Sequence, residues 1–138
     1  MFDQCLYFNT TALARQLERE WADAFKPFGL TAPQAFLLRA ILQRPGALQR
    51  EVADAMNISR PTATRALDAL ADKGWIERKR TEHDGRESAV HPTARAIAIR
   101  AALDASSAEV TSRLRSLLGE ASFAGTVAQL RAIRDALS

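Results

Sequence analysis

Residues 49–93 constrain this chain most, because they combine two short helices, a tight turn and a hairpin in one continuous order. A helical stretch over residues 49–56 is followed by the turn Asn57-Ile58-Ser59 and by a second helical stretch that ends at Gly74. The serine of this turn is a favourable N-cap, and a glycine readily adopts the left-handed backbone that ends helices. Strand-forming residues 75–81, a turn and a return strand come next. This order predicts a helix-turn-helix followed by a wing.

Helical periodicity continues on both sides of this segment. Apolar residues recur at three- and four-residue steps over residues 10–28, and Gly29 ends that helix. Thr31 is a plausible N-cap for the next helix, and Pro92-Thr93 opens a long one that ends near Gly119. The long apolar stripe of that helix includes Ile97, Ala101, Val110, Leu114 and Leu117.

These elements predict a mainly α (α+β) fold in three parts. Residues 1–30 form an N-terminal helix that contributes to dimerisation, residues 31–92 form a winged helix-turn-helix lobe, and residues 93–138 form C-terminal dimerisation helices. The 138 residues are 47% hydrophobic and 25% charged, which is ordinary for a globular domain. The single cysteine excludes an intrachain disulfide, and no run approaches the roughly 18 apolar residues of a membrane span. With no signal peptide recognisable either, we expect a cytoplasmic protein without a membrane partner.

The second helix of the motif carries side chains suited to double-stranded DNA. A recognition helix places its first residues against base edges in the major groove, where arginine pairs with guanine and small hydroxyl side chains allow close approach. The buried face of this helix should be Ala63, Ala66, Leu67 and Leu70. We predict that DNA is contacted by Arg60, Thr62, Thr64 and Arg65, and that the helix N-terminus offers peptide N–H groups to a phosphate.

The hairpin supplies a second basic element. Three cations lie on its outgoing strand and one lies just past its tip, and arginine inserts favourably into a narrow minor groove. Asp84 and Gly85 form the turn, and Asp84 either orients Arg86 or caps the turn. The wing residues predicted to bind DNA are Arg78, Lys79, Arg80 and Arg86.

The chain resembles the MarR-type winged helix regulators over nearly its whole length. The resemblance is carried by the element order, by the Asp84-Gly85-Arg86 wing motif leading to Pro92-Thr93, and by Leu70-x-x-Lys73-Gly74-Trp75-Ile76-x-Arg78. It implies a homodimeric transcriptional regulator, usually a repressor, often released by a small ligand or by oxidation. It also implies that Arg86 is the minor-groove arginine. The return strand departs from the family pattern at Glu87, which dilutes the positive field of the wing.

Binding to a pseudo-palindromic operator requires two recognition helices roughly 34 Å apart, and the terminal helices are the natural dimer contacts. The alternative is that their apolar stripes fold back on the core of the same chain. The residues expected across the twofold axis are Phe2, Leu6, Phe8, Val127, Leu130, Ile133 and Leu137.

Two features point to a regulatory signal. An effector pocket between the terminal helices and the lobe would be lined by the aromatic residues Trp21, Phe25, Phe28 and Phe36, unless these are plain core. Cys5 could serve as a redox sensor, but its flanks show neither a cation nor a helix N-terminus, so a structural role is the better interpretation.

Other functional classes find little support in the sequence. The cluster Glu82-His83-Asp84 lacks the second histidine and the cysteines typical of metal sites, and no catalytic or phosphate-binding motif occurs. We therefore expect no enzyme activity, metal or cofactor. A winged helix used only to bind protein remains an alternative, but it would need an apolar recognition-helix face.

Overall fold

The structure is a computed structural model that describes residues 1–81 and 87–138. It confirms the predicted winged helix with flanking helices. The helices are α1 (Leu6–Phe25), the 3-10 turn η1 (Lys26–Phe28), α2 (Ala32–Gln43), α3 (Gln49–Ala55), α4 (Arg60–Asp72), α5 (Ala94–Leu118) and α6 (Glu120–Leu137). The strands are β1 (Ala47–Leu48), β2 (Ile76–Arg80) and β3 (Ser88–Pro92).

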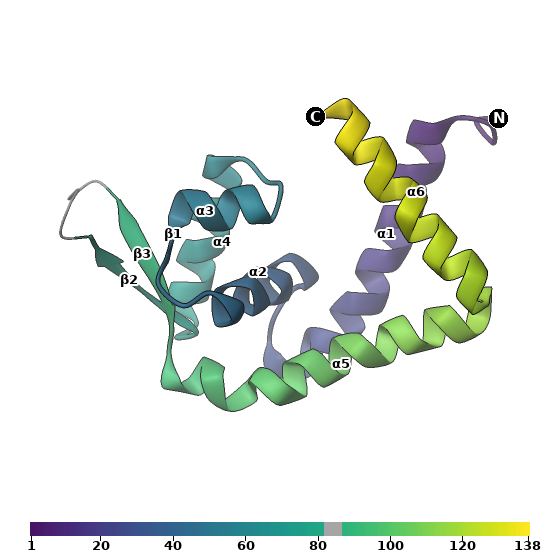
Figure 1. Cartoon of the computed structure of the whole chain (residues 1–138). Helices are drawn as coiled ribbons and strands as arrows, with labels where there is room; N and C mark the ends of the chain where they lie inside the picture. Colours follow the sequence, from purple (N-terminus) through teal and green to yellow (C-terminus); the bar gives the residue numbers. More distant parts are fainter. Residues whose placement is uncertain (82–86) are drawn as a thin grey trace.

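The elements form a lobe at one end of the molecule and a frame of long helices at the other (Figure 1). Helices α2, α3 and α4 and the sheet make up the lobe, and α5 runs from the lobe along the base of the molecule. At its far end α6 folds back, so that the two chain termini lie on the same side. Helix α1 packs on both α5 and α2 and so connects the frame to the lobe.

The sheet has three antiparallel strands in the order β1-β3-β2. Pairing of Ile76 with Pro92 and of Arg80 with Ser88 fixes the register of the wing. The sequence predicts only the hairpin, because β1 has two residues and no periodicity of its own. Its pairing with β3 ties the second wing strand to the start of α3.

Local chemistry explains where the helices of the lobe begin and end. Thr31 and Gln34 form a capping box at the start of α2, and the Ser59 hydroxyl accepts the Thr62 N–H at the start of α4. In the turn between α3 and α4, Asn57 has a φ of 55°, a left-handed conformation that asparagine tolerates well. Gly74 follows α4 with a φ of 81°, as predicted for the residue that ends this helix.

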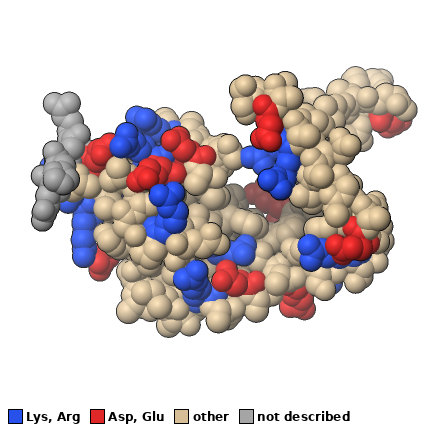
Figure 2. All heavy atoms as spheres, viewed as in Figure 1, with Lys and Arg blue, Asp and Glu red and all other residues tan. Residues whose placement is uncertain are grey.

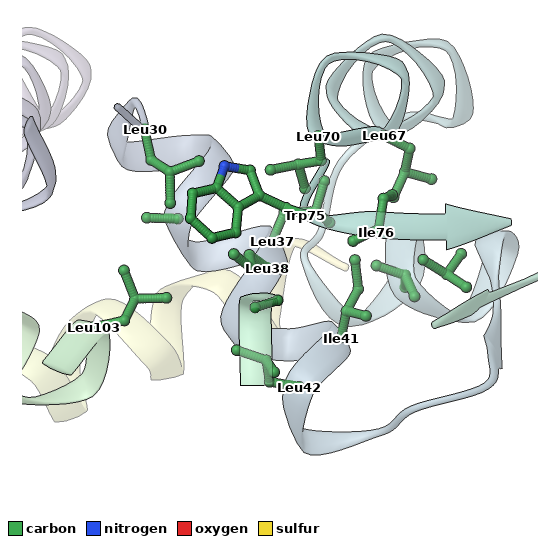
Figure 3. Close-up of a cluster of buried hydrophobic side chains, with 14 of the residues drawn as sticks. Leu30, Leu37, Leu38, Ile41, Leu42, Leu67, Leu70, Trp75, Ile76 and Leu103 are labelled. Carbon is green, nitrogen blue, oxygen red and sulfur yellow. The ribbon is translucent and has the colours of Figure 1, made fainter. Parts of the chain in front are cut away.

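The hydrophobic core lies inside the lobe and extends to α5 (Figure 3). Leucine and isoleucine side chains of α2 meet α4, the start of β2 and Leu103 of α5. On α4 the predicted face is confirmed: Ala63, Leu67 and Leu70 are buried, and Ala66 is half-buried against them.

The apolar stripe of α5 is only partly buried within one chain. The buried residues of this helix are Ala96, Leu103, Ser107 and Val110, whereas Ile97 is 59% exposed and Leu117 is 80% exposed. Apolar side chains occur on more than one side of α5, because only part of its surface packs on α1 and α2. The periodicity alone could not tell which side that is.

At the far end of the frame, few side chains are buried within one chain. Helix α6 has no buried residue, and its packing partner is α5. Among the residues that the structure describes, no helix combines the length and the apolarity that crossing a bilayer requires.

Candidate nucleic-acid interface

The first two turns of α4 present a polar surface outward. Arg60, Thr62, Thr64 and Arg65 are all exposed, while the opposite face of the helix is buried against α2 and α3. Neither arginine forms an ion pair with any residue in the described ranges 1–81 and 87–138. Both guanidinium groups therefore keep their donors available for an external partner.

The main chain at this helix end has less to offer than the sequence suggested. Pro61 has no N–H, the Thr62 N–H is bonded to the Ser59 hydroxyl, and the Ala63 N–H is bonded to the Ser59 carbonyl. The N-cap interactions thus occupy N–H groups that could otherwise bind a phosphate. Anion binding at the start of α4 depends mainly on its side chains.

The two threonines differ in what their hydroxyl groups can still do. Thr64 Oγ1 donates to the Arg60 carbonyl at 2.9 Å, so its lone pairs remain as acceptors. Thr62 Oγ1 accepts from Ser59 Oγ at 2.9 Å, so its own hydrogen remains available to donate. The helix end therefore offers one donor suited to a phosphate oxygen and one acceptor suited to a base amino group.

The cations of β2 have unequal surroundings. Arg78 Nη1 donates to Asp68 Oδ1 of α4 at 2.6 Å, so this side chain fastens the wing to α4. Lys79 and Arg80 are exposed and have no acidic partner within the described part of the chain. Basic and acidic side chains consequently alternate over this end of the lobe (Figure 2). The wing residues Asp84, Gly85 and Arg86 lie outside the described residues.

The apolar residues expected at a dimer interface have little cover within the chain. Phe2, Leu6, Phe8, Val127, Leu130 and Leu137 are exposed, and Ile133 is half-buried. A groove of 530 Å³ between α1, α5 and α6 is lined mainly by apolar side chains, including Leu13, Leu117 and Leu130. These apolar stripes therefore do not fold back on the core of the same chain.

The four aromatic residues proposed for an effector pocket separate into two groups. Trp21 and Phe36 line a 420 Å³ groove between α1, α2 and Met56, next to the turn of the helix-turn-helix. Phe25 is fully buried and meets Phe36 edge to face, so it is core, and Phe28 packs half-buried against the same core. Only the first two residues face open space in this groove.

A polar network that the sequence did not indicate lies beside this groove. Buried Ser107 of α5 accepts from Trp21 Nε1 at 3.0 Å and from Arg39 Nη1 at 2.9 Å. Arg39 Nε also donates to Asp104 at 2.9 Å, and its guanidinium lies over the Phe36 ring. The network joins α1, α2 and α5, and so links the frame to the lobe.

Cys5 is exposed and occupies the N-cap position of α1, which begins four residues earlier than the predicted helix. The sequence shows no sign of a helix N-terminus near this thiol. Exposure and a helix N-terminus are both features of reactive cysteines, whereas the structural role predicted for Cys5 requires a contact that this chain alone does not provide.

Comparisons with known proteins point to one family. Residues 28–87 match the model of the MarR family. The uncharacterised helix-turn-helix-type transcriptional regulator YwoH of Bacillus subtilis is 31% identical over 77 residues, which are 56% of this chain and 56% of YwoH. YybA of the same organism is 31% identical over 81 residues, 59% of this chain and 54% of YybA. The matched segment thus spans about half the length of these curated relatives.

Solved structures resemble the whole chain. The transcriptional repressor CouR bound to a 23-mer DNA duplex is 25% identical with a TM-score of 0.88, covering 96% of this chain and 94% of CouR. CouR bound to p-coumaroyl-CoA is also 25% identical, with a TM-score of 0.87 and the same coverage. The Staphylococcus aureus MepR–DNA complex shares the fold at 22% identity and a TM-score of 0.86, covering 96% of this chain and 97% of MepR.

Proposed function

We propose that this chain, whose winged-helix segment matches the MarR family, is a sequence-specific DNA-binding transcriptional regulator. In this proposal it is a repressor that binds pseudo-palindromic operators as a homodimer. Helix α4 is the recognition helix, and the wing contacts the adjacent minor groove.

One observation carries the proposal: the exposed start of α4 has two arginines without acidic partners in the described part of the chain and two threonines with complementary hydrogen-bonding capacity. Arginine reads guanine edges, and hydroxyl groups bond phosphates or bases. A winged helix that only binds protein would instead need an apolar face here. CouR and MepR have both been solved on DNA, which supports the same use of the fold.

The surface of the frame supports the proposed dimer. The apolar groove and the exposed side chains of α1 and α6 supply a surface that a second copy of the chain would cover. A twofold axis through this surface would hold two α4 helices on one side of a duplex, as a pseudo-palindromic site requires.

Selection of bound sequences from a random duplex pool tests the proposal directly. We expect an enriched site with two inverted half-sites about one helical turn apart, and affinity that falls steeply with salt. A pool that shows no enrichment, together with no binding at either low or moderate salt, would leave the protein-interaction module as the better interpretation.

A second proposal concerns control by a small molecule. The groove at Trp21 and Phe36 lies between the frame and the turn of the helix-turn-helix, so an occupant would contact both parts. CouR binds p-coumaroyl-CoA in one of its structures, which supports an effector for this chain without naming it. A thermal-shift screen of small metabolites checks this: a true effector stabilises the wild type, releases DNA and loses its effect in Phe36→Ala.

A further inference from the structure

A cleft of 180 Å³ separates the N-terminal ends of α3 and α4 from the start of β3. Arg60 and Thr64, two of the proposed DNA contacts, form one wall of this cleft. Arg50 of α3 and Glu87, which directly precedes β3, lie on the other side. A phosphate that enters this cleft from the start of α4 therefore also comes close to Arg50 and Glu87.

The far side of the cleft is rich in hydrogen-bond acceptors. Arg50 Nε lies 3.2 Å from Glu87 Oε1, with the carboxylate side chain 32% exposed and the arginine side chain 55% exposed. Beside them Gln49 Oε1 is buried and has no hydrogen-bond partner among the described residues. These acceptors favour a cation on this side of the cleft, and Arg50 is the cation that pairs there with Glu87.

The ion pair is exposed enough to be exchanged. Ion pairs between side chains in contact with water stabilise proteins only weakly, whereas a guanidinium can bond a phosphate through two parallel hydrogen bonds. A DNA phosphate is therefore a competent competitor for Arg50. If Arg50 transfers to the phosphate, the Glu87 carboxylate is left unpaired beside a polyanion, which opposes the transfer.

We propose that Glu87 sets the DNA affinity of this chain by competing with the phosphate backbone for Arg50. The inference rests on the proposed DNA-binding function and adds a residue that limits it. Because the contested contact is made to the backbone, Glu87 weakens binding to random duplexes as well as to operators. Glu87 thus lowers the affinity of the chain for duplex DNA of any sequence.

The test compares Glu87→Gln, Arg50→Ala and the double variant with the wild type, by fluorescence anisotropy on random and selected duplexes at several salt concentrations. One additional phosphate contact steepens the slope of log affinity against log salt by about 0.9, which is about 8-fold in affinity at 0.1 M salt. We expect this tightening in Glu87→Gln on both kinds of duplex, and its loss when Arg50 is also replaced.

Glu51→Gln is the matched control, because Glu51 pairs with Arg44 at 3.3 Å on the same helix and does not line the cleft. It reports the effect of losing one negative charge and releasing an arginine outside the cleft, and the amide oxygen of glutamine can still accept the Leu48 N–H. The proposal is overturned if Glu87→Gln binds DNA no tighter than this control. It is also overturned if Glu87→Gln tightens binding by the same factor when Arg50 is already replaced by alanine. Thermal unfolding checks that each variant is folded. If Glu87→Gln is unfolded, Glu87→Ala takes its place in the comparison.

The result for the wild type separates this inference from the function on which it rests. A wild type that binds duplexes with the usual salt dependence, while Glu87→Gln matches the control, rejects the competition and leaves the regulator intact. A wild type that binds no duplex at any salt concentration rejects both.

Discussion

Arg78 of β2 bonds Asp68 of α4 at 2.6 Å and so holds the first wing strand against that helix. The sequence predicts Arg78 as a DNA contact, but in the free protein its guanidinium serves this internal link. The cations left without an acidic partner in the described part of the lobe include Arg60, Arg65, Lys79 and Arg80. The basic residues of the lobe thus include one that links β2 to α4 and others that are exposed without an acidic partner in the described ranges.

The link predicts coupled effects of Arg78→Ala and Asp68→Ala. The pair is partly exposed, with side-chain exposures of 30% and 52%, so each variant should lose at most about 1 kcal/mol of unfolding free energy. Urea unfolding of both single variants and of the double variant measures the coupling. A double variant whose loss is the plain sum of the single losses would mean that the two side chains do not interact in solution.

Arg65→Ala should discriminate between base and backbone contacts. Loss of a base contact costs about 1–3 kcal/mol on a selected operator and much less on a random duplex. Anisotropy titrations on the two duplexes give the difference. Arg100→Ala, which removes a charge from α5, serves as the control. Equal losses on both duplexes would make Arg65 a phosphate contact instead.

Ser107→Ala should destabilise the protein by about 1–3 kcal/mol. The buried hydroxyl accepts from both Trp21 and Arg39, and its removal leaves two donors without their partner. Ser106→Ala is the neighbouring control, since no hydrogen bond of that side chain is part of this network. Urea unfolding at one fixed protein concentration compares the two, and similar midpoints would show that the network adds nothing to stability.

Leu130→Glu tests the dimer. Leu130 lines the apolar groove at the frame, and a carboxylate there would be buried without a partner when a second chain covers it. Sedimentation should show a monomer at micromolar concentration with an unchanged circular dichroism spectrum, and affinity for an inverted repeat should fall to that of a half-site. Gln129→Glu is the control, because it places the same charge on α6 at the residue next to Leu130. A dimeric Leu130→Glu protein would place the interface elsewhere.

The lobe can be predicted from sequence because local signals fix each of its helices. Ser59 and Gly74 mark the two ends of α4, and small and large apolar residues between them occupy one face. The polar residues on the opposite face then follow from helical geometry alone. For this reason the sequence is sufficient to identify which side chains are exposed at the start of α4.

Contacts between distant residues cannot be predicted in this way. Arg39 and Asp104 are 65 positions apart, and Trp21 and Ser107 are 86 apart, so no spacing in the sequence relates them. The side of α5 that packs against the lobe is unpredictable for the same reason, because it depends on where α1 and α2 meet that helix. The small number of free N–H groups at the start of α4 is different, because it could have been predicted from the sequence. A serine N-cap accepts N–H groups of the first turn, and a proline two residues later has no N–H to offer.

The two-residue strand β1 has a mechanical consequence. Strand β1 pairs with β3 and continues directly into α3. The hairpin therefore cannot move independently of the helices without breaking the hydrogen bonds between β1 and β3. A signal that arrives from the α1 side must therefore displace helices and hairpin together. In the proposed dimer it would alter the distance between the two lobes more readily than the shape of either lobe.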